Sequence, residues 1–208
     1  LKQKISLFGS GRTDSGVHAL AQSAHFISKT KIKNKFIFIN IFNFFLKKNK
    51  ISILDIDKKK RNFHARYSAK KRTYMYVIIN RIAQLSLDTD RAWHIKSPLN
   101  IKSIKKAAEL LKGTKDFSTF RSSSCGAKSA IRTLDQAKVT VKGDKIIIIF
   151  KSKSFLQQQV RSMVGCLKFV GENKWSLKKF KAAIYSKKRI NCAPPAPARG
   201  LYLLKVSY

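Results

Sequence analysis

The order of apolar and polar positions in the first eighty residues predicts several strands and one helix. Residues 2–8 are predicted to form a strand that runs into a glycine-rich turn, and residues 17–27 form a second extended segment. Apolar positions at helical spacing predict an amphipathic helix over 34–47. A basic, aromatic stretch separates two further predicted strands, at 51–56 and 69–79. This part of the chain therefore reads as a mixture of helix and strand.

The rest of the chain repeats a similar order after a connecting loop over 80–98. The pattern predicts three helices and three strands, which are the helices 100–111, 155–170 and 176–187 and the strands 130–141, 145–152 and 201–207. Asn100 is suited to begin its helix and Gly113 to stop it, while Lys142-Gly143-Asp144 is typical of a hairpin turn. We expect an α+β protein with an N-terminal unit over 1–85 and a C-terminal unit over 86–208.

Charge suggests the class of partner. Lysine and arginine number 45 and acids only 10, a formal net charge of +35, and RNA is the polyanion that such a surface would suit. Codon bias is the alternative, because Lys, Ile, Asn and Phe are all heavily used, and it explains part of the lysine excess. It does not explain why acids are so scarce, and Asp14 is the sole acid in the first 54 residues.

Other features argue against metal, cofactor and membrane roles. Three dispersed cysteines and four histidines show no metal-ligand spacing, and no dinucleotide or phosphate-loop motif is present. The longest apolar stretch, 36–46, is too short for a bilayer. No signal peptide is visible, although the chain opens on Leu1. We therefore expect a protein of the cytoplasm that needs no metal or cofactor.

Three segments could carry chemistry. Asp14 lies in a loop between Gly11 and Gly16, where the backbone can turn sharply; a purely structural turn is the alternative. Tyr74 follows basic residues on a predicted strand, which suits stacking on an unpaired base, although a half-buried strand tyrosine is the commoner case. Arg161 lies beside apolar helix positions and would need an anionic partner there, unless it simply extends to solvent.

Together these segments resemble the tRNA pseudouridine synthase A family. The most specific match is Gly11-Arg12-Thr13-Asp14-Ser15-Gly16-Val17-His18-Ala19. The other matches follow in the family's order: Asn62-Phe63-His64-Ala65-Arg66-Tyr67-Ser68-Ala69, Arg72-Thr73-Tyr74-Met75-Tyr76, Asp116-Phe117-Ser118-Thr119-Phe120-Arg121, Phe155-Leu156 with Val160-Arg161-Ser162-Met163-Val164-Gly165, and Ala196-Pro197-Ala198-Arg199-Gly200-Leu201.

The resemblance implies isomerisation of uridine to pseudouridine in the anticodon stem-loop of tRNA, at positions 38–40. It implies Asp14 as nucleophile at C1′ of the ribose, or as base at C2′, and Arg161 as its ion-pair partner. Tyr74, Arg12 and Arg66 would contact the substrate, with Tyr74 stacked on the extruded uracil. Because Arg161 lies close to the buried helix face and the Asp14 loop holds no other acid, we expect the two side chains to form an ion pair.

The resemblance also implies a fold and an assembly. It predicts two ferredoxin-like halves with antiparallel sheets joined side by side, helices on one face, a cleft between the halves, and a homodimer. The family's usual first strand and helix have no counterpart here, so we expect about a quarter of the usual chain to be absent. The runner-up function is a non-catalytic RNA-binding or chaperone protein, and a ribosome-associated protein is a more distant alternative. Retention of Asp14, Arg161 and Tyr74 favours the enzyme.

Overall fold

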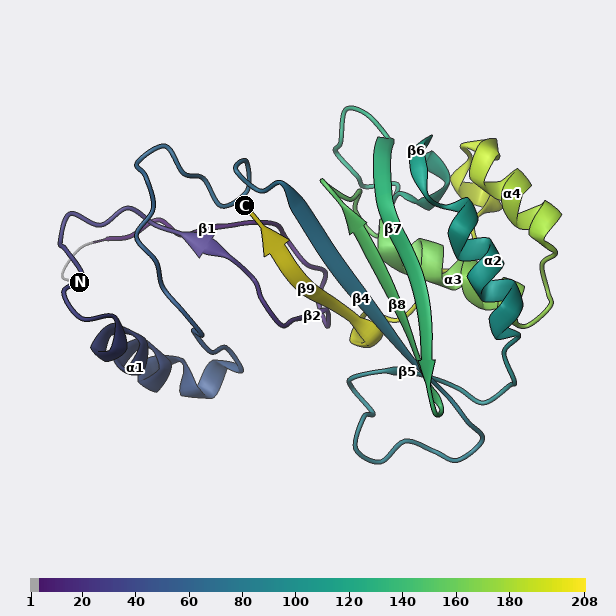
Figure 1. The fold of residues 1–208 in the computed structure, drawn as a ribbon, viewed down its shortest axis with the longest axis horizontal. Helices are drawn as coiled ribbons and strands as arrows, with labels where there is room; N and C mark the ends of the chain where they lie inside the picture. The colour runs from purple at the N-terminus through teal and green to yellow at the C-terminus, as the bar shows by residue number, and fades with distance from the viewer. Residues whose placement is uncertain (1–3) are drawn as a thin grey trace.

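The computed structural model describes residues 4–208 and has a sheet-and-helix body with an extended N-terminal region beside it (Figure 1). The N-terminal region contains two short strands that pair with each other, β1 (Phe8–Gly9) and β3 (Ala24–His25), and one helix, α1 (Lys35–Leu46). Asn34 begins α1, with its side-chain oxygen accepting from the Ile37 N–H. The helix predicted over 34–47 is therefore confirmed.

The body is built on one seven-stranded sheet that runs in the order β2, β9, β4, β8, β7, β6, with β5 paired to β4. The strands are β2 (His18–Ala19), β4 (Lys71–Asn80), β5 (Trp93–Ile95), β6 (Gly113–Asp116), β7 (Ile131–Lys142), β8 (Lys145–Ser152) and β9 (Leu201–Ser207). The pairs are antiparallel except β2 with β9 and β4 with β5. The predicted strands at 69–79, 130–141, 145–152 and 201–207 are confirmed.

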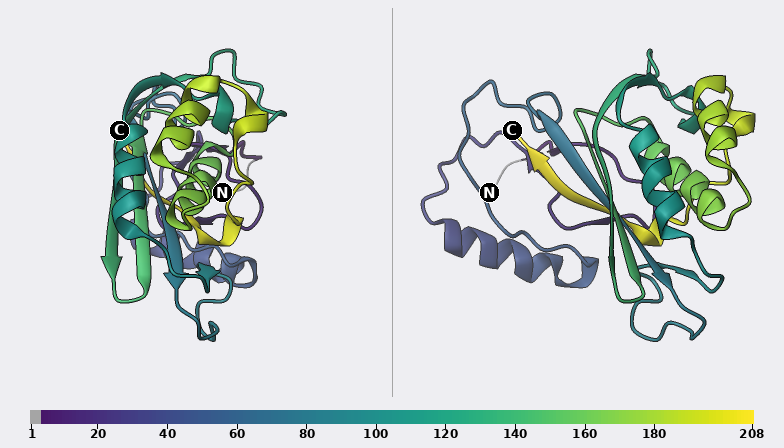
Figure 2. Two further views of the ribbon diagram at one scale, coloured as in Figure 1. Left: turned by 90° about the vertical axis from the view of Figure 1, so that its right-hand side faces the viewer. Right: turned by 45° about the vertical axis from the view of Figure 1, so that its right-hand side comes forward.

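Three helices cover one face of this sheet, whereas α1 lies apart at the other end of the molecule (Figures 1 and 2). They are α2 (Ile101–Leu110), α3 (Gln159–Gly171) and α4 (Leu177–Ser186). Alternate β8 side chains, Ile146, Ile148 and Phe150, are buried in the same core as Met163 and Leu167 of α3. Burial of these apolar side chains fixes α3 against the sheet. The α+β class is confirmed.

The main sheet includes strands from both predicted units. β2 and β4 come from 1–85, and β5 to β9 come from 86–208, yet all pair in one sheet. Directly after the last strand, the Tyr208 hydroxyl donates to the Ala65 carbonyl of the N-terminal region at 2.9 Å. The division at residue 85 and the pair of ferredoxin-like halves stay predictions.

Several sequence-based boundaries differ from the structure. Of the strand predicted at 2–8, only Phe8 is in a strand, and residues 2 and 3 lie outside the described part. The segment 17–27 contains two separate two-residue strands. The segment 51–56 forms no strand, because the Asn43 side chain satisfies the Ile53 backbone instead, accepting from its N–H at 2.7 Å and donating to its carbonyl at 3.0 Å.

In the C-terminal part, α3 begins at Gln159 rather than near 155. Gln158, the residue before it, has φ +61°, in the left-handed region that interrupts a helix. The buried Gln159 side chain then accepts a hydrogen bond from the Leu156 N–H at 2.8 Å, which fixes the turn that precedes the helix. The predicted loop over 80–98 also contains β5, which pairs with β4 in parallel.

A close approach of backbone to α3 explains why residue 165 has no side chain. A Cβ on Gly165 would lie 2.0 Å from the Pro194 carbonyl oxygen, in the segment that also carries Ala196. A Cβ at this position would therefore force the Pro194 backbone to move, because a backbone carbonyl cannot rotate away as a flexible side chain can.

We predict that Gly165→Ala lowers the free energy of unfolding by about 1–3 kcal/mol, the usual cost of overpacking. Gly126→Ala is the matched control, because a Cβ there meets nothing within 4 Å. Urea denaturation of both variants measures the difference. Equal stability of the two variants would contradict the close packing of α3 against 194–196.

Candidate active site

The Asp14 loop is held in shape by polar contacts at both of its ends. At its start, Ser10 is buried and its hydroxyl donates to Gln22 Oε1 at 2.6 Å, while the Gln22 amide donates to the Gly11 carbonyl at 3.1 Å. At its end, the Val17 N–H donates to the Asp14 carbonyl at 3.1 Å and closes a turn. Gly16 occupies the turn with φ +77°, a conformation that favours glycine. The loop therefore presents Asp14 on a constrained backbone.

Arg161 reaches this loop from α3. Its Nη1 lies 2.8 Å from Asp14 Oδ2, across 147 positions of sequence, and the expected ion pair is therefore present. The side chains are mostly shielded, with exposed fractions of 16% for Arg161 and 29% for Asp14. Incomplete solvation strengthens the attraction compared with a surface pair, and it also makes either charge costly to leave alone.

A second hydrogen bond fixes the direction of the Arg161 side chain. Its Nε donates to the Ala196 carbonyl at 2.7 Å, and the Ala196 N–H donates back to the Arg161 carbonyl at 3.0 Å. The planar guanidinium thus binds a carbonyl with one edge and a carboxylate with another. The segment around Ala196 was singled out only as a match to the family, and the structure shows that its backbone orients Arg161.

Tyr74 lies on β4 at a point where the pairing with β9 shifts, between Thr73 and Tyr74. Such bulges redirect side chains. The ring of Tyr74 packs edge-on against Phe155, with centroids 5.2 Å apart. Burial raises the pKa of the Tyr74 hydroxyl; the nearby Arg72 charge opposes this shift and the Asp14 charge adds to it. Tyr74 is thus a neutral phenol within electrostatic reach of Asp14.

Tyr76, two positions further along β4, has a different environment. It is fully buried, and its hydroxyl donates to the Pro197 carbonyl at 2.7 Å. A Cβ on Gly200 would lie 2.7 Å from its ring, so the turn before β9 packs directly on it. Tyr76 therefore supports the 196–200 segment, a role that the strand pattern did not distinguish from that of Tyr74.

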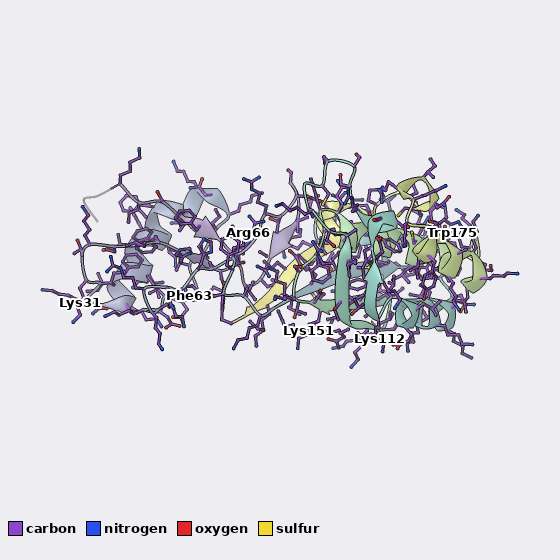
Figure 3. All side chains as sticks on the ribbon, turned by 90° about the horizontal axis from the view of Figure 1, so that it is seen from above. Lys31, Phe63, Arg66, Lys112, Lys151 and Trp175 are labelled. Atoms are coloured by element: carbon purple, nitrogen blue, oxygen red, sulfur yellow. The ribbon has the colours of Figure 1, made fainter. Side chains whose placement is uncertain are left out.

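The two remaining predicted site residues are less closely tied to the ion pair. Arg12 is exposed, two positions before Asp14. Arg66 is exposed as well, between the N-terminal region and the sheet (Figure 3), with its guanidinium 5.8 Å from the centre of the Tyr67 ring. Both have solvent-accessible charges that could meet a phosphate, so their part in substrate binding stays a prediction.

Within residues 4–208, no cluster of three or more histidine, cysteine or acidic side chains is arranged to hold a metal ion. In the same part of the chain, no helix combines the length and apolar character needed to cross a membrane.

Comparison with known proteins places the chain in a family. The model of the family described as tRNA pseudouridine synthase matches residues 107–208. A protein of Pelagibacter ubique named tRNA pseudouridine synthase A is 56% identical over 208 residues, which is all of this chain and 85% of that protein. This chain thus covers 85% of the relative's length, more than the three quarters that the sequence led us to expect.

Proteins of the same name from two further bacteria match almost as fully. The Parvibaculum lavamentivorans protein is 42% identical over 206 residues, covering 99% of this chain and 83% of its own length. The Xanthobacter autotrophicus protein is 44% identical over 206 residues, covering 99% of this chain and 84% of its own. Alignments of this extent include the Asp14 loop as well as the Arg161 helix, and the chain belongs to the tRNA pseudouridine synthase A family.

Proposed function

We propose that this protein isomerises uridine to pseudouridine in the anticodon stem-loop of tRNA, with Asp14 as the catalytic carboxylate. The observation that carries the proposal is the Asp14–Arg161 pair, which holds a carboxylate in a fixed direction on a constrained loop. The relatives' name gives the reaction and the substrate class. The target positions 38–40 and the homodimer rest on the resemblance, and the cytoplasmic location rests on the sequence features given above.

The reaction needs few chemical groups. The bond between C1′ of the ribose and N1 of uracil breaks, the base turns, and C5 bonds to C1′; C5 then loses its proton and N1 gains one. Product and substrate have the same composition, so no group is added or removed. One carboxylate, acting as nucleophile at C1′ or as base at C2′, can start this sequence. Asp14 is suited to either role, because the Arg161 guanidinium donates a hydrogen bond to the carboxylate and orients it.

The substrate must also bring its base out of the helical stack. Extrusion of a base costs a few kcal/mol, which contacts to the extruded uridine offset. The half-buried Tyr74 ring, edge-on to Phe155 and near Asp14, offers a surface for the uracil. The strongly positive chain, with a formal net charge of +35, would attract the tRNA backbone independently of sequence.

We predict that Asp14→Asn lowers the rate of pseudouridine formation roughly 10³-fold or more, as expected for loss of a reacting group. Binding of tRNA should stay within about twofold, because phosphate contacts supply most of the affinity. Asp144→Asn, which removes a carboxylate from an exposed pair with Arg81, is the control. Mapping pseudouridine by carbodiimide-stop primer extension measures the rates. Appreciable isomerisation by Asp14→Asn would show the assignment to be wrong.

We predict that Arg161→Lys keeps the charge but loses about 10- to 100-fold in kcat, because one ammonium cannot engage Ala196 and Asp14 as the guanidinium does. The control is Arg189→Lys. Arg189 also contacts α3, donating to the Ser162 hydroxyl at 2.9 Å, but it is not part of the pair with Asp14. Single-turnover rates at saturating tRNA compare the two. Similar rates for both variants would contradict the role given to Arg161.

We predict that Tyr74→Ala reduces kcat about 10- to 100-fold, in keeping with about 1–3 kcal/mol for one base–aromatic stack. Tyr74→Phe should retain a rate within about threefold of the wild type, since the ring is kept. Tyr185→Ala, which removes an exposed ring from α4, controls for general loss of aromatic surface. If the Phe and Ala variants were equally impaired, the hydroxyl and not the ring would be the important group.

A further inference from the structure

Arg72 is bound to three separate segments around the site. Its Nη2 donates to the Ser10 carbonyl and to the Arg66 carbonyl, both at 2.8 Å, and its Nη1 donates to the Lys153 carbonyl at 2.7 Å. Arg72 itself lies on β4, and none of the three acceptors belongs to that strand. One side chain therefore joins β4 to the Ser10 and Lys153 segments, 62 and 81 positions away, and to Arg66 just before the strand.

Each of these segments leads to a residue of the site. Ser10 begins the loop that carries Asp14, and it is buried. Lys153 continues from β8 toward Phe155, whose ring supports Tyr74. Arg72 stands two positions before Tyr74 on β4 and lies near enough to affect its pKa. The Arg72 guanidinium thus contacts both the segment that leads to Asp14 and the segment that leads to Phe155, the residue packed against Tyr74.

The acceptors of Arg72 are all neutral carbonyls. Within residues 4–208, Arg72 forms no ion pair with an acidic side chain, whereas its neighbour Lys71 forms one with Asp135. A charged donor makes stronger hydrogen bonds to carbonyls than a neutral one, and a guanidinium can direct several at once from a planar frame. Three such bonds resist relative movement of the segments that they join.

We propose that Arg72 is a positioning residue for the isomerisation, acting through Asp14 and Tyr74 rather than on the RNA. By holding Ser10 and Lys153 to β4, it fixes the distance between the carboxylate and the surface that receives the base. Placement of this kind matters strongly, because an error of about 1 Å between reacting groups can cost roughly 10²-fold in rate. The inference rests on the proposed function.

The test compares Arg72→Lys and Arg72→Gln with the same changes at Arg81. Arg81 follows the other end of β4 and has a similar set of bonds, to the Ala83 and Gln84 carbonyls and to Asp144. It lies at the opposite end of the strand from Tyr74. Single-turnover rates, KM for tRNA and thermal unfolding are measured for all four variants, after the wild type has been shown to form pseudouridine.

We predict that Arg72→Lys lowers kcat at least about tenfold and Arg72→Gln lowers it further, with KM within about twofold of the wild type. A single lysine nitrogen cannot reach carbonyls that Nη1 and Nη2 bind separately, so the charge alone should restore only part of the rate. Both Arg81 variants should keep kcat. If Arg72→Gln fails to fold, the kcat of Arg72→Lys alone tests the positioning role.

Three results would overturn the inference. An unchanged kcat in Arg72→Lys would remove the positioning role. A fall in rate that matches only the fraction of protein unfolded would make Arg72 purely structural. A raised KM with unchanged kcat would make it an RNA contact. A wild type without activity would instead contradict the proposed function, which distinguishes the two failures.

Discussion

The ion pair between Asp14 and Arg161 is the contact on which the arrangement of the site depends. It connects a loop near the start of the chain with a helix of the C-terminal part, across 147 positions. The helix is placed by its buried face against β8, and the loop is placed by Ser10, Gln22 and the turn at Gly16. Because the helix and the loop are each fixed by their own contacts, forming the ion pair costs little conformational entropy, and the Asp14 carboxylate keeps one direction.

The segment before β9 supports Arg161 through its backbone. Ala196 and Pro197 give their carbonyls to Arg161 and Tyr76, and Gly165 leaves room for Pro194 to pass close to α3. The proline-rich connection before β9 is therefore a backbone support for the guanidinium. In a chain with 45 basic and 10 acidic residues, Arg161 is a shielded cation: its side chain is 16% exposed, and it binds the Asp14 carboxylate and the Ala196 carbonyl.

Part of this could be predicted from the sequence, because the relevant signals are local. Asn100 was expected to begin its helix and caps α2 with its side chain, and Gly143 was expected in the hairpin between β7 and β8. The Asp14–Arg161 pair could be anticipated because a shielded arginine needs an anion and the Asp14 loop offered one. These expectations depended on residue type, which the sequence states directly.

The parts that could not be predicted depend on backbone groups. Every residue has a carbonyl, so no pattern indicates that Ala196 would accept from Arg161, or that Ser10, Arg66 and Lys153 would accept from Arg72. The missing strand at 51–56 has the same origin, since Asn43 satisfies the Ile53 backbone. The left-handed Gln158 that delays α3 is accompanied by a local bond from the Leu156 N–H to the Gln159 side chain, which the spacing of apolar positions does not indicate.

The central claim is that Asp14 is the group that meets the ribose of the target uridine. A crystal structure of the protein with a tRNA anticodon stem-loop tests it most directly. The account predicts an extruded uridine on the Tyr74 ring, with C1′ or C2′ about 3–3.5 Å from an Asp14 oxygen, the separation of reacting atoms before attack. It also predicts that Arg161 remains bound to Asp14. A uridine held elsewhere, with its sugar out of reach of Asp14, would contradict the account.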